Sequence, residues 1–90
     1  MRVIWSPAAL ADIGRIYDYI SAFNPAAAAG LVREFKSCGD SLRDFPERGR
    51  PIANRRREVV VIWPYVVRYR VVRDDVQILR VRHGRQRPLP

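Results

Sequence analysis

The chain has 90 residues, 17 Lys or Arg against 9 Asp or Glu, a formal net charge of +8 and 48% hydrophobic residues. A chain of this length builds one hydrophobic core, which excludes two independent domains, so we predict a single domain over residues 1–90. Residues 1–45 carry five basic and five acidic groups, whereas residues 46–90 carry twelve and four, so the whole net charge lies in the second half. A cationic half of this kind is suited to an anionic partner, such as nucleic acid, an acidic protein segment or an anionic membrane surface.

Several functional classes are excluded by what the composition lacks. Cys38 is the only cysteine and cannot form an intramolecular disulfide, and the longest strongly apolar run, residues 59–63, is too short to cross a bilayer. We therefore expect a cytoplasmic protein with no membrane partner. One histidine and one cysteine far apart in sequence do not supply three or four metal ligands, so we expect no metal and no cofactor.

The first half predicts a strand and then a helix. Residues 1–5 are β-branched and aromatic, and Ser6 and Pro7 supply an N-cap and a proline at the first helical position. Apolar side chains then recur at helical spacing, which predicts one buried face and one hydrated face. The expected buried residues are Leu10, Ile13, Ile16, Tyr17 and Ile20, and the expected hydrated ones are Asp12, Arg15 and Asp18.

A second helix and three strands complete the prediction. Asn24 and Pro25 repeat the capping pattern, and the helix that they open is expected to end at Pro46 and to form an antiparallel hairpin with the first. An irregular segment follows, and residues 58–62, 65–72 and 75–82 read as strands. We predict an α+β fold of order strand, helix, helix, strand, strand, strand, with the helical hairpin against one face of an antiparallel sheet.

Alternation along the last two strands predicts an arginine-bearing face. Period-two spacing places Arg68 and Arg70 on one face of their strand, and Ile78, Arg80 and Arg82 on one face of the next. This face is expected to point to solvent or to a partner. Residues 85–90 are expected to form a mobile tail.

RNA cleavage is the enzymatic reaction that these side chains fit best. It needs an acid, a base and cations that hold phosphate, and His83 among arginines meets part of that requirement. The simpler alternative is that His83 ends a strand within a hydrated charge cluster.

A series of motifs in the same order resembles the ParE branch of the RelE/ParE toxin superfamily. They are Trp5 to Ile13, Ile16 to Ile20, Asn24 to Ala28, Phe45 to Pro51, Arg57 and Glu58, Pro64 to Val71, and Ile78 to Arg87. The resemblance implies the toxin of a type II toxin–antitoxin module, with a small antiparallel sheet against a helical hairpin. It also implies a hetero-oligomer with a ParD-like antitoxin whose acidic C-terminal segment folds on binding.

Two targets are known within this superfamily. RelE-like members cut mRNA in the ribosome, but Val66 stands where they have a catalytic arginine, and their C-terminal catalytic tyrosine has no counterpart. ParE-like members are non-enzymatic poisons of DNA gyrase, so we expect no enzymatic activity. The gyrase reading makes the target-binding surface Arg80, Arg82, His83, Arg85 and Arg87, with nucleic acid contact as an option; the nuclease reading makes His83 and Arg68 the catalytic residues.

For the antitoxin's carboxylates, we expect basic residues of the sheet and of the loop before it. These are Arg55, Arg56, Arg57, Arg68 and Arg70. A third hypothesis is a basic nucleic-acid-binding module without toxicity, whose binding would depend steeply on salt.

Overall fold

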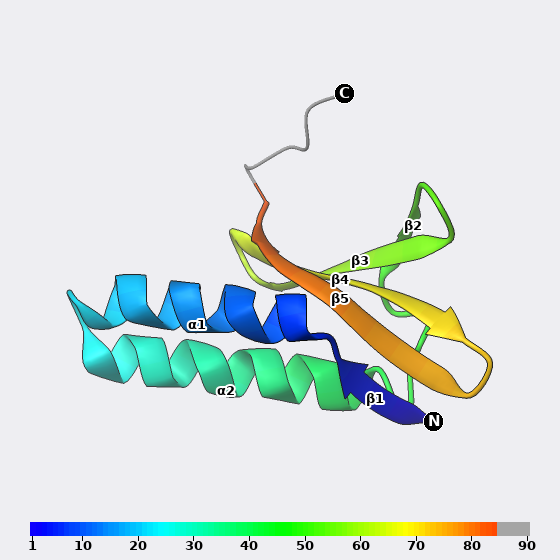
Figure 1. Ribbon diagram of the computed structural model, residues 1–90, viewed down its shortest axis with the longest axis horizontal. Helices are drawn as coiled ribbons and strands as arrows, with labels where there is room; N and C mark the ends of the chain where they lie inside the picture. The colour runs from blue at the N-terminus through cyan, green and yellow to red at the C-terminus, as the bar shows by residue number, and fades with distance from the viewer. Residues whose placement is uncertain (85–90) are drawn as a thin grey trace.

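The computed structural model describes residues 1–84, which form two helices and one five-stranded sheet (Figure 1). Arg85, Arg87 and the predicted mobile tail lie outside the described residues. In chain order the elements are β1 (Arg2–Trp5), α1 (Pro7–Ser21), α2 (Pro25–Ser41), β2 (Arg50–Ile52), β3 (Arg56–Ile62), β4 (Tyr65–Val72) and β5 (Asp75–His83).

The predicted α+β fold with a helical hairpin against a sheet is confirmed. The strand order is β1-β5-β4-β3-β2, so the last strand lies between the first strand and β4. All neighbouring pairs are antiparallel except β1 and β5, which are parallel. The sheet is therefore mixed, and it contains one more strand than predicted.

Both helices begin as their capping residues predict. The Ser6 hydroxyl accepts a hydrogen bond from the Ala9 amide at 3.0 Å, and the Asn24 side chain accepts one from the Ala27 amide at 3.1 Å. Proline follows each cap at the first helical position. The hairpin packs on one face of the sheet (Figure 1), and the core between them consists of Ala9, Phe35, Cys38, Leu42, Val59, Val67, Tyr69, Val76, Ile78 and Val81.

Two element boundaries differ from the prediction. Helix α2 ends at Ser41, before the turns that lead to Pro46. The segment predicted to be irregular contains β2, whose three residues pair with the start of β3. Tyr69 holds the link between α2 and β2, because its hydroxyl donates to the Pro46 carbonyl at 2.7 Å and accepts from the Gly49 amide at 2.8 Å.

A β-bulge changes which residues of β5 face the core. Tyr69 pairs with Ile78 and Arg68 pairs with Arg80, so Leu79 is an extra residue without a partner on β4. Ile78 and Val81 consequently both point into the core and are 0% and 2% exposed. The prediction that Ile78 shares the outer face with Arg80 and Arg82 is wrong for this reason.

Candidate functional site

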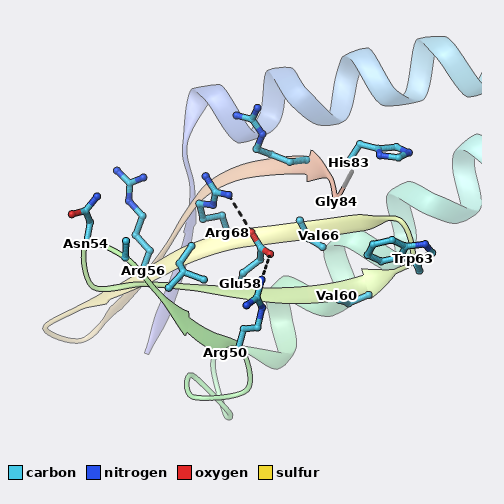
Figure 2. A pocket seen from close by; sticks show the side chains of 13 residues that line it. Arg50, Asn54, Arg56, Glu58, Val60, Trp63, Val66, Arg68, His83 and Gly84 are labelled. Atoms are coloured by element: carbon cyan, nitrogen blue, oxygen red, sulfur yellow. Dashed lines mark hydrogen bonds and ion pairs between the residues drawn. The ribbon is translucent and has the colours of Figure 1, made fainter. Parts of the chain in front are cut away.

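A cleft of about 830 Å³ lies on the face of the sheet that the helices leave open (Figure 2). Alternation places its lining there, because Glu58 pairs with Arg68 and Val60 with Val66, while the intervening Val59 belongs to the core. The lining residues fall into two groups. The cationic group is Arg50, Arg56, Arg68 and Arg82, and the apolar group includes Val60, Trp63 and Val66.

Glu58 lies between two of these arginines. Its Oε1 accepts from Arg50 Nη2 at 3.3 Å, and its Oε2 accepts from Arg68 Nη2 at 3.2 Å (Figure 2). The Glu58 and Arg68 side chains are only 15% and 17% exposed, whereas that of Arg50 is 74% exposed. One carboxylate therefore bridges a shielded and a hydrated guanidinium.

The shielded guanidinium has a donor left over. Arg68 Nε is buried and has no hydrogen-bond partner among residues 1–84. Buried donors in proteins are almost always paired with protein or water, so an orphaned one calls for an acceptor. Glu58 contacts this guanidinium from within the cleft, so an acceptor for Arg68 Nε is expected to bind in the cleft as well.

A second hollow, of about 500 Å³, lies between α1 and the end of β5. Asp12 is 5% exposed there, and its carboxylate accepts from Arg80 Nε at 2.8 Å, Arg80 Nη2 at 3.0 Å and the Val81 amide at 3.0 Å. Arg15 is also ion-paired with it. The prediction that Asp12 lies on the hydrated face of the helix is therefore wrong, and Leu10, predicted to be buried, is 55% exposed.

These contacts set the ionisation of Asp12 and Arg80. Burial alone raises the pKa of the Asp12 carboxyl, but the hydrogen bonds from Arg80 and Val81 and the charges of Arg80 and Arg15 outweigh it and hold that pKa below its ordinary value. The hydrogen bond and the charge of Asp12 in turn raise the pKa of Arg80. Arg80 is thus a permanent cation already held by a buried carboxylate.

His83 ends β5 on the helix side of the sheet. It pairs with Tyr65, and the two rings meet edge to face with centroids 5.6 Å apart. Tyr65 in turn contacts Phe35 of α2 edge to face, with centroids 6.0 Å apart. Figure 2 shows the His83 imidazole directed away from the Glu58–Arg68 pair, although the residue borders the cleft.

The structure divides the predicted target-binding residues between the two hollows. Arg82 and His83 border both, whereas Arg80 lines only the hollow next to α1. Arg85 and Arg87 lie outside the described residues.

The arginines predicted to meet the antitoxin also occupy different places. Arg56 and Arg68 line the cleft, and Arg70 on the same face donates to Gln77 at 2.8 Å. Arg57 lies on the opposite face, where it donates to the backbone carbonyls of Glu47 and Gly49. Arg55 is exposed in the β2–β3 turn with a φ of 58°.

Sequence reasoning gave no role to Arg50, Glu58 or Asp12. The first two meet only through the register of β2 on β3, and β2 is a strand that the sequence did not predict. One sequence signal pointed to the contacts of Asp12, namely its helical spacing. It stands three residues after Ala9, which is buried, and three residues before Arg15, with which it forms an ion pair. Within residues 1–84, no three His, Cys, Asp or Glu side chains gather closely enough to hold a metal ion, and no helix there is long and apolar enough to span a membrane.

Comparison with known proteins places this chain in a family. The model of the ParE toxin of the type II toxin–antitoxin system parDE matches residues 3–88. Toxin RelE2 of Caulobacter vibrioides is 46% identical over 83 residues, covering 92% of this chain and 94% of that protein, and the putative toxin Y4kP of Sinorhizobium fredii is 38% identical over 87 residues, covering 94% and 90%. Toxin RelE1 of Caulobacter vibrioides is 33% identical over 85 residues, covering 91% of each chain.

A solved structure agrees with these sequence matches. A chain of the chromosomal ParDE system from P. aeruginosa superposes with a TM-score of 0.80 at 28% identity, covering 92% of this chain and 95% of that one. The chain described here therefore belongs to the ParE toxin family of type II toxin–antitoxin systems.

Proposed function

We propose that this toxin poisons DNA gyrase without enzymatic activity of its own and is neutralised by a ParD-like antitoxin with an acidic C-terminal segment. Arg82 and His83, together with Arg80 and the tail residues Arg85 and Arg87, form the surface that contacts the target. An antitoxin rich in carboxylates complements a net charge of +8, and the solved relative is described as part of a ParDE system. We place the pair in the cytoplasm, where gyrase and DNA are found.

One observation supports a binding surface over a nuclease centre. Arg68 lies on the open face of the sheet in an ion pair with Glu58, whereas the ring of His83 packs edge-on against Tyr65 on the helix side. An acid and a phosphate-holding cation must meet on the same scissile group. Both residues border the cleft, but the His83 ring is directed away from the Glu58–Arg68 pair. Val66, which is 4% exposed, supplies no cation between them.

The alternative is a RelE-like, ribosome-dependent mRNA endoribonuclease. It is favoured by the names of two relatives, toxins RelE1 and RelE2, and by the fact that Arg68 and His83 both border one cleft. In that case His83 is the acid or base, and Arg68 holds the phosphate.

The two proposals are separated by assaying one preparation of antitoxin-free toxin on both targets. We expect gyrase-linked DNA breaks and loss of supercoiling, with mRNA intact on programmed ribosomes. Cleaved mRNA with unaffected gyrase would overturn the gyrase proposal and assign the toxin to the nuclease branch.

Two substitutions then test the surface itself. Arg82→Gln should weaken gyrase poisoning, whereas Arg33→Gln, an equal charge change on an exposed part of α2, should not. His83→Ala should reduce binding modestly in a poison, but should lower the rate of a nuclease by about 10²–10⁴-fold. Equal poisoning by the Arg82 and Arg33 variants would remove Arg82 from the target surface.

A further inference from the structure

The cleft on the open sheet face holds an anion supplied by the chain itself. Glu58 projects from β3 between Arg50 of β2 and Arg68 of β4 and places one carboxylate oxygen on each guanidinium. Arg56 and Arg82 also line this cleft, so its lining contains four arginines and one carboxylate. The surplus positive charge is available to a second anion.

The carboxylate satisfies its neighbours only in part. Both of its oxygens accept a hydrogen bond, yet each arginine donates only one to it, and Arg68 Nε remains buried without an acceptor among residues 1–84. Arginine binds oxyanions best through two parallel N–H···O bonds, here through Nε and Nη2. Glu58 places one carboxylate oxygen on Arg68 Nη2 and the other on Arg50, so it does not fill both donors of Arg68.

A phosphodiester matches this unfilled fork better than a carboxylate does. Its tetrahedral phosphorus carries two non-bridging oxygens and two ester oxygens, so one group can accept from Nε and Nη2 of Arg68 and still face Arg50. The apolar end of the cleft carries Trp63, a residue that is 60% exposed and whose ring lies against Gly84. Exposed indole rings beside arginines are stacking platforms for the bases of single-stranded nucleic acid.

We propose that Glu58 is an internal competitor for a phosphodiester-binding site formed by Arg50 and Arg68, and that single-stranded nucleic acid displaces it and stacks a base on Trp63. In the unbound protein, Glu58 neutralises the arginines and lowers the affinity of the cleft for nucleic acid. The proposal does not require gyrase to be the target, because it concerns binding by the isolated toxin. Failure of the gyrase assay and failure of this binding test are therefore separate results.

The test measures binding of a short, fluorescently labelled oligothymidylate to the full toxin by anisotropy at fixed salt. Glu58→Gln removes the competing charge and keeps the shape of the side chain. Glu47→Gln is the matched control, because it changes the net charge equally from an exposed position that does not line the cleft. We expect Glu58→Gln to tighten binding about five- to tenfold, as the loss of two partly exposed ion pairs allows, and Glu47→Gln to tighten it less than about twofold.

Two arginine variants supply an independent readout. Arg68→Gln should weaken binding and make the dependence of log K on log salt shallower by about 0.7, the value for one phosphate contact on a single strand. Arg50→Gln changes a 74%-exposed side chain, so we expect the fold to stay intact; it should also weaken binding more than Arg33→Gln does. Trp63→Ala should weaken binding without changing the salt dependence.

Three results would overturn the proposal. The first is Glu58→Gln binding no tighter than Glu47→Gln. The second is Arg50→Gln binding as tightly as Arg33→Gln, a comparison that stands even if the Glu58 variant fails to fold. The third is an equal gain for an oligoglutamate peptide with Glu58→Gln, which would assign the site to acidic proteins instead of nucleic acid.

Discussion

Replacement of Asp12 by asparagine should destabilise the toxin strongly, because this carboxylate is buried and holds Arg80 and the Val81 amide. Asparagine keeps one oxygen for Val81, but it turns an N–H₂ group toward the guanidinium of Arg80. Removal of one partner from a fully buried ion pair costs about 3–5 kcal/mol. The Asp12 side chain is 6% exposed but that of Arg80 is 40% exposed and can regain water, so we expect about 2–3 kcal/mol.

This loss is large for a chain of 90 residues, whose whole stability is about 5–13 kcal/mol. Urea denaturation followed by tryptophan fluorescence should show a midpoint lowered by about 1–2 M. The control is Asp18→Asn on the same helix, at an exposed side chain that makes no ion pair among residues 1–84. A free energy of unfolding for Asp12→Asn within about 0.5 kcal/mol of the control would refute the assigned role of Asp12.

Three further predictions concern acid stability and the packing of the core. Because the pKa of Asp12 is lower in the folded than in the unfolded protein, this carboxylate stabilises the fold above its ordinary pKa of about 3.9. The free energy of unfolding should therefore fall as pH drops below about 4. An equally steep fall below about pH 4 in the Asp12→Asn variant would contradict this role of Asp12. Tyr69→Phe should cost about 1–3 kcal/mol in urea denaturation, because the Pro46 carbonyl and the Gly49 amide both lose a partner, and an unchanged midpoint would argue against that hydroxyl's role. Gly39→Ala should lower the melting temperature measured by circular dichroism, because the new Cβ would lie 2.5 Å from a Trp5 ring carbon. Overpacking of this kind costs about 1–3 kcal/mol. A melting temperature equal to that of the parent would show that the Trp5 indole moves aside at little cost in stability.

The helical hairpin could be predicted from sequence because its signals are local. Ser6 and Asn24 each cap a helix through a side chain that reaches an amide three residues away, and a proline fixes the next φ. However, the local sequence does not determine which face of α1 packs against the sheet. The stripe that packs on the sheet includes Ala9 and Asp12 beside the predicted Ile13 and Ile16, whereas Leu10 is exposed.

The candidate site could be predicted only in part. Positive charge on the last two strands was evident, and Arg68 and Arg82 do line a cleft. The contacts of Glu58 depend on the register of three strands, and one of them, β2, has only three residues, including a proline. The bulge at Leu79 likewise has no signature in the alternation, yet it decides which residues of β5 reach the core.

The position of β5 in the sheet has a consequence for the order in which the molecule can fold. It is the last strand along the chain, but it lies between β1 and β4 and brings Val76, Ile78 and Val81 to the core. Among residues 1–84, β1 has no other neighbour in the sheet, so its backbone pairing waits until some seventy further residues have been synthesised. Nascent chains of this toxin thus keep an incomplete apolar core during most of their translation, and they acquire their finished surface late and all at once.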